Sequence, residues 1–152
     1  MVSVLLLCSF PGPDHVAEWR PDSDAIRSAV IALCDWTASD ADRMLVVLDN
    51  DEGVTALVRS ILPETSMRVV ASLDDALIRT LSCAVLIGGM DEEINLAKAI
   101  RKAGKKVWPM ATTGAAARRF LYEIVQSFQR SERSALLALC NYAYLYKTIL
   151  PS

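Results

Sequence analysis

A pair of glycines is the first feature of this sequence that could hold a ligand. Gly88 and Gly89 follow an apolar run and precede the acidic residues 91–93. Glycine lets a ligand approach the backbone, and its N–H group can bind an anion or a ribose. A lone glycine pair more often marks a tight turn with no ligand, and acids after it suit a helix start. Gly88, Gly89 and Met90 are candidate backbone contacts to an anion or a ribose. Glu93 is the candidate catalytic residue, or a partner for a sugar hydroxyl.

Thr112, Thr113 and Gly114 repeat this arrangement at the end of a later apolar run. Hydroxyl groups and N–H groups at the start of a helix can hold a phosphate, and Arg118 follows within the first turns. An ordinary helix start with a surface arginine explains the same residues. These four residues are therefore candidates for nucleotide binding, with the ordinary helix start as the alternative.

The remaining reactive side chains predict neither a metal centre nor a nucleophilic triad. His15 is the only histidine, and the cysteines are widely spaced in apolar stretches, at Cys8, Cys34, Cys83 and Cys140. This pattern is typical of free, buried thiols in a reducing compartment. A triad would need partners for His15 that the sequence does not indicate. We expect no metal and no cofactor.

Five short apolar runs are typical of strands covered on both faces. They are Val2–Ser9, Met44–Asp49, Met67–Ala71, Cys83–Gly88 and Lys106–Ala111. Amphipathic helical patterns lie between them, at residues 25–34, 54–62 and 94–103, with a shorter one at 73–81. The alternation predicts an α/β fold: a Rossmann-like, doubly wound parallel sheet of about five strands, with helices on both faces. In such a sheet, ligands lie beyond the carboxyl ends of the strands. Ser9 and Asn50, which end the first two runs, are therefore expected to line the same crevice.

The chain ends in a predicted helical tail. Residues 113–150 have a helical pattern that is broken near residues 130–134, and residues 131–150 are expected to form a C-terminal helix. The last part is rich in leucine and tyrosine, which suits packing on the sheet and contact with another subunit equally well. We therefore expect a homo-oligomer, with an effector protein as a possible partner.

The composition limits the functions further. The 152 residues are 53% hydrophobic and 22% charged, which predicts one folded domain over residues 1–152. Sixteen basic against eighteen acidic residues leave a net charge of −2, which speaks against binding nucleic acid. No uncharged apolar run reaches the roughly 20 residues that cross a membrane, and the start lacks a cationic signal-peptide region. We expect a cytoplasmic protein that contacts no membrane.

Two segments give the chain a resemblance to a known family. Residues 83–97 read CAVLIGGMDEEINLA, and residues 104–117 read GKKVWPMATTGAAA. Together they resemble the SLOG superfamily, the Rossmann-like group that includes the DNA-processing protein A domain and the cytokinin-activating LOG enzymes. Residues 45–58 also resemble the second strand and helix of SLOG sensor domains. The resemblance implies a nucleotide site at the Gly-Gly turn, the glutamate helix and the Thr-Thr-Gly segment.

The departures from the LOG enzymes favour a sensor. Those enzymes carry P-G-G-x-G-T-x-x-E, whereas this chain has Ile87 in place of the proline and lacks the Gly-Thr pair. The resemblance therefore implies binding of a nucleotide-derived signal, such as an ADP-ribose-like molecule or a cyclic nucleotide, as in bacterial defence systems. The alternative is an enzyme that cleaves an N-glycosidic bond, a phosphoribohydrolase or a nucleoside deoxyribosyltransferase. A scaffold that binds a partner through its tail is a third hypothesis.

Overall fold

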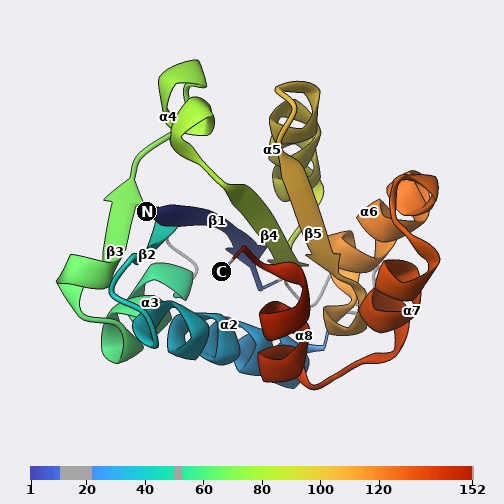
Figure 1. Cartoon of the computed structure of the whole chain (residues 1–152), viewed down its shortest axis with the longest axis horizontal. Coiled ribbons are helices and arrows are strands. Elements are labelled where there is room, and N and C mark those ends of the chain that lie inside the picture. The colour runs from blue at the N-terminus through green and yellow to red at the C-terminus, as the bar shows by residue number, and fades with distance from the viewer. Residues whose placement is uncertain (11–21, 50–52, 152) are drawn as a thin grey trace.

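One parallel sheet organises the computed structural model, which describes residues 1–10, 22–49 and 53–151 (Figure 1). Its strand order is β3-β2-β1-β4-β5. The strands are β1 (Val2–Ser9), β2 (Arg43–Leu48), β3 (Met67–Val70), β4 (Cys83–Gly88) and β5 (Lys106–Met110). The chain runs outward from β1 to β3 and then returns to the other side of β1. The predicted α/β, doubly wound sheet is therefore confirmed, and each predicted strand end lies within one residue of the observed one.

Helices connect the strands and cover both faces of the sheet. The α-helices are α2 (Ser23–Ala38), α3 (Val54–Ile61), α4 (Asp75–Thr80), α5 (Asp91–Lys102), α6 (Ala115–Ile124), α7 (Arg130–Ala138) and α8 (Tyr142–Ile149). Three short 3₁₀ turns are η2 (Glu64–Ser66), η3 (Ala111–Thr113) and η4 (Val125–Ser127). Helices α2, α3 and α8 lie on one face, α5 lies on the other, and α6 and α7 lie on the β5 side (Figure 1).

The central strand explains why the strand signals are continuously apolar. In β1, Val4, Leu5, Leu6 and Leu7 are each at most 2% exposed. Strand β1 pairs with β2 on one side and β4 on the other, and helices cover both of its faces. Side chains on both faces of β1 are therefore removed from water, so no polar alternation survives in the sequence.

Polar residues set where three of the helices begin. The Asp22 side chain accepts a hydrogen bond from the Ala25 N–H (3.0 Å), and Asp74 accepts one from Leu77 (2.7 Å). In the tail, the Asn141 side chain accepts one from Tyr144 (3.2 Å). Each bond satisfies an N–H group that has no partner within its helix.

The tail forms two helices where one was expected over residues 131–150. Helix α7 ends at Ala138, and α8 begins at Tyr142 after the cap at Asn141. The earlier break falls at η4 and the two residues after it, before Arg130, rather than within residues 130–134. The prediction of a single C-terminal helix missed this second break because the cap that restarts the helix is one local side-chain bond.

Helix α8 packs on the chain's own α2. Tyr146 is fully buried, and its hydroxyl donates a hydrogen bond to the Ala29 carbonyl (2.9 Å). Its ring stacks on Tyr142, with 6.5 Å between the ring centroids. Three large apolar side chains in the described part of α6 and the tail remain exposed. They are Tyr122, Leu137 and Tyr144. Most of the apolar signal in α8 therefore comes from packing within one chain.

The cysteines follow the prediction at three of four positions. Cys8, Cys34 and Cys83 are buried, but Cys140 is exposed, because the residues between α7 and α8 do not reach the core. Burial raises the pKa of Cys83 to about 12, and burial together with the nearby Asp35 does the same for Cys34. These two thiols therefore stay protonated at neutral pH.

Within the described residues, no helix is both long enough and apolar enough to cross a lipid bilayer.

Candidate functional site

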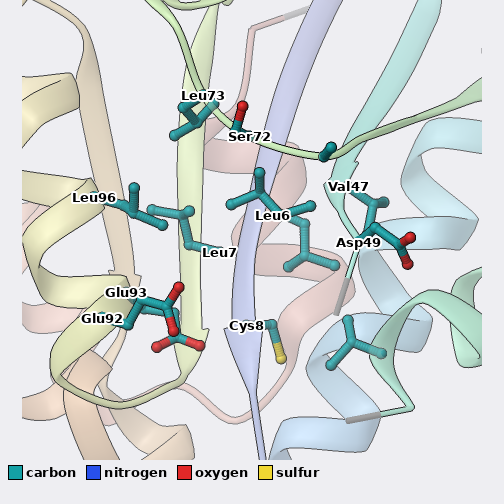
Figure 2. A pocket seen from close by; sticks show the side chains of 13 residues that line it. Leu6, Leu7, Cys8, Val47, Asp49, Ser72, Leu73, Glu92, Glu93 and Leu96 are labelled. Atoms are coloured by element: carbon teal, nitrogen blue, oxygen red, sulfur yellow. The ribbon is translucent and has the colours of Figure 1, made fainter. Parts of the chain in front are cut away.

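A cavity of about 270 Å³ opens where β1 and β2 end, at the carboxyl edge of the sheet (Figure 2). Its walls are the ends of these strands, the start of α3, the first turns of α5, and the segment that leaves β3. Leu73 lies at the top of the view and Leu96 below it on the left, and Cys8 lies near the end of β1 (Figure 2). We call this cavity the edge pocket. It lies at the carboxyl edge of the sheet, the edge at which doubly wound folds bind ligands, beside the β1–β4 switch point.

Helix length explains why this part of the sheet stays open. Helix α4, which links β3 to β4, has six residues, whereas α5 has twelve. Helix α5 contacts β1, β4 and β5, and α4 lies beyond the sheet in Figure 1. The segment at residues 71–73 therefore walls the pocket in place of a helix.

Three carboxylates lie among the described residues that line the edge pocket. Glu92 and Glu93 lie on its α5 side, and Asp49 lies across from them at the end of β2 (Figure 2). Glu93 is 9% exposed, and its Oε2 accepts a hydrogen bond from the Met90 N–H (3.1 Å), which fixes its position. No lysine, arginine or histidine occurs among the described residues that line the pocket. Its described wall is therefore acidic.

Sequence reasoning missed two of these carboxylates. Asp49 and Glu92 also lie beyond the carboxyl ends of strands, but their neighbours Asn50 and Glu93 are the predicted site residues. Their positions in the sequence could have identified both carboxylates. Asp49 comes directly after β2, and Glu92 precedes Glu93 in the first turn of α5. Asn50 itself lies outside the described residues.

The Gly-Gly turn has the expected backbone shape but different hydrogen bonding. Gly88 and Gly89 have φ angles of +55° and +85°, which favour glycine. The Gly88 N–H donates to Thr113 Oγ1 (2.9 Å), and the Gly89 N–H donates to the Ser9 carbonyl (3.0 Å). Both N–H groups, like that of Met90, already have acceptors within the protein. The missing Cβ atoms let Ile26 of α2 and Ser9 of β1 pack against Gly88, and Glu93 of α5 and Ala116 of α6 pack against Gly89.

Both threonine hydroxyls also have partners within the chain. Thr113 is fully buried; its hydroxyl accepts from Gly88 and donates to the Met110 carbonyl (2.6 Å). The Thr112 hydroxyl lies 3.2 Å from the Leu139 carbonyl and 2.9 Å from the Tyr142 hydroxyl. A ligand would have to displace one of these bonds to reach either hydroxyl. The Thr113 hydroxyl therefore links the ends of β4 and β5, and the Thr112 hydroxyl bonds to residues of the C-terminal tail.

The other predicted residues lie beside this network. The Gly114 N–H donates to the Ala111 carbonyl (3.0 Å), and Arg118 Nε donates to the same oxygen (3.3 Å). Ser9 is 3% exposed, and its hydroxyl has no hydrogen-bond partner among the described residues. Within the described part of the chain, the Ser9 hydroxyl at the end of β1 is therefore free to bond a ligand.

The two predicted turns are adjacent, as the parallel sheet requires. The Ala116 N–H donates to the Gly89 carbonyl (3.3 Å), which adds to the bond between Gly88 and Thr113. Of the predicted site residues that the structure describes, Glu93 is the one that lines the edge pocket. The structure therefore separates a hydrogen-bonded cluster at the turns from a pocket on the β1–β2 side, with Glu93 between them.

The described part of the chain contains no group of three His, Cys, Asp or Glu residues placed to hold a metal ion. Comparison with protein-family models, curated proteins and solved structures finds no match to this chain. Any functional assignment therefore depends on the fold and on the geometry of the edge pocket.

Proposed function

We propose that this chain binds a nucleotide-derived small molecule, the function that its resemblance to SLOG sensor domains implies, and that the ligand lies in the edge pocket rather than at the two turns. The observation that supports the proposal is the position of the pocket: the carboxyl edge of a doubly wound sheet, beside the helix that carries Glu93. Leu73 and Leu96 offer apolar surface to a base, and carboxylate oxygens accept hydrogen bonds from sugar hydroxyls.

A thermal-shift screen of the full chain tests the proposal. The probes are nucleosides, nucleotides, ADP-ribose and cyclic nucleotides, and a binder present at 100 times its Kd should stabilise the chain by about 2.7 kcal/mol. Glu93→Gln keeps an oxygen for the Met90 N–H but removes the charge, so we expect roughly tenfold or weaker binding with little loss of stability. Glu64→Gln, at an exposed glutamate outside the pocket, is the matched control. If no probe raises the melting temperature, the proposal is wrong.

Cleavage of an N-glycosidic bond is the second candidate, and the three carboxylates of the pocket favour it. Such cleavage passes through an oxocarbenium-like centre, which a nearby carboxylate can stabilise or attack. Chromatography of the screened mixtures distinguishes the candidates. Release of free base that disappears in Glu93→Gln supports the enzyme, and recovery of the intact ligand supports a binding domain.

We also propose that the chain forms homo-oligomers. The exposed apolar side chains Tyr122, Leu137 and Tyr144 are the described surface residues that support this, and an effector protein is the other occupant such a surface could take. Sedimentation velocity at micromolar protein should show a species larger than the monomer, and Leu137→Ala with Tyr144→Ala should reduce it. A monomer across the concentration range would contradict self-association.

A further inference from the structure

The charge around the edge pocket restricts which part of a ligand it can hold. Asp49, Glu92 and Glu93 supply negative charge from two sides, and the described lining contains no cation. A phosphate placed among them would meet like charges: water screens the exposed Asp49 and Glu92 in part and the buried Glu93 less. Hydroxyl and amino groups, in contrast, can donate hydrogen bonds to the same carboxylates. The pocket therefore suits the uncharged, donor-rich part of a ligand.

The neighbouring turn does not offset this charge. Phosphate sites in α/β folds depend on N–H groups left unpaired at a helix start. Here the N–H groups of Gly88, Gly89 and Met90 already donate to Thr113, Ser9 and Glu93 at 2.9–3.1 Å. The first three residues of α5 are also acidic, so carboxylates already face the positive end of this helix. The turn therefore offers a phosphate none of these three N–H groups, and at the start of α5 the phosphate would meet acidic side chains.

The volume of the pocket, like its charge, favours a small part of a ligand. Its volume of about 270 Å³ lies just below the usual range of ligand sites, which begins near 300 Å³. It can hold one base–sugar unit more readily than a whole dinucleotide-like molecule. The rest of a larger ligand would extend out of the pocket into solvent.

We infer that the edge pocket takes the nucleoside part of its ligand and selects a nucleoside over the matching 5′-monophosphate. The inference rests on the proposed function, because it assigns a ligand class to the same site. Asp49 and Glu92 are the residues that determine this specificity. Their carboxylates repel the phosphate and accept hydrogen bonds from the uncharged ligand.

Isothermal titration calorimetry of the full chain with four ribonucleosides and their 5′-monophosphates tests the inference. We expect at least one nucleoside to bind, with its monophosphate roughly tenfold weaker or worse. The double variant Asp49→Asn, Glu92→Gln should bring the ratio of the two Kd values to about threefold or less. The control is Asp35→Asn with Glu64→Gln, which removes the same number of charges at exposed sites outside the pocket and should leave the ratio unchanged.

The outcomes separate this inference from the proposed function. If monophosphates bind as tightly as nucleosides, or more tightly, the inference is wrong and the proposed function stands. If the ratio does not change in the double variant, or changes equally in the control, Asp49 and Glu92 do not determine the selectivity, and the inference is also wrong. If neither ligand class binds, the proposed function is wrong, and the inference fails with it.

Discussion

Tyr146→Ala is expected to lower the free energy of unfolding by about 3–5 kcal/mol, the range for removing a large buried ring. Tyr146 is fully buried between α8 and α2, and its hydroxyl is bonded to Ala29. Burial also raises the pKa of this phenol well above its ordinary value, so the hydroxyl remains a donor at any pH used for unfolding. The loss is measured as the urea dependence of far-ultraviolet circular dichroism.

Two further variants divide this effect. Tyr146→Phe keeps the ring and should cost about 0.5–1.5 kcal/mol, the net value of one hydrogen bond. Lys147→Ala removes an exposed side chain at the next position of the same helix and should stay within about 0.5 kcal/mol of the parent. Equal losses at positions 146 and 147 would mean that α8 does not pack on α2 through Tyr146.

The second large effect is expected for Gly88→Ala. A Cβ at position 88 would lie 2.6 Å from Cδ1 of Ile26 and 3.1 Å from the Ser9 carbonyl oxygen. Ile26 is fully buried, so its side chain has little space into which it can move. Overpacking costs about 1–3 kcal/mol, and a left-handed backbone at a non-glycine residue costs about 1–2 kcal/mol more. We expect a total loss of about 2–5 kcal/mol in the same urea titration.

Gly104→Ala isolates the backbone part of this loss. Gly104 has a φ of +87°, but a Cβ there would have nothing within 4 Å. Only the backbone cost of about 1–2 kcal/mol should therefore appear. If the two alanine variants are equally stable, the contact between the end of β4 and α2 is looser than the structure describes.

The strands could be predicted from the sequence because burial on both faces leaves a simple signal. The apolar runs around Leu5, Val46 and Val85 are continuous, and each ends within a residue of the observed strand. The break between α7 and α8 could not be predicted in this way, since it depends on one side-chain cap at Asn141. A local bond of this kind leaves no periodic pattern.

The candidate site was predictable in position but not in chemistry. The glycine pair and the Thr-Thr-Gly segment do meet at the carboxyl edge, as a parallel sheet requires. The sequence does not show that Thr113 satisfies the N–H of Gly88, which lies 25 residues earlier. It also does not show that the accessible cavity lies on the side of Asp49. Both facts depend on contacts between distant segments.

The short connection after β3 has a consequence for how the binding site could change. Residues 71–73 form one wall of the edge pocket, but they belong to a surface link between β3 and α4 rather than to a strand. Doubling the length of such a link costs only about 0.6 kcal/mol in closure entropy. Insertions there could deepen, narrow or roof the cavity while all five strands keep their register. The shape of the edge pocket can therefore vary at residues 71–73 without loss of core stability.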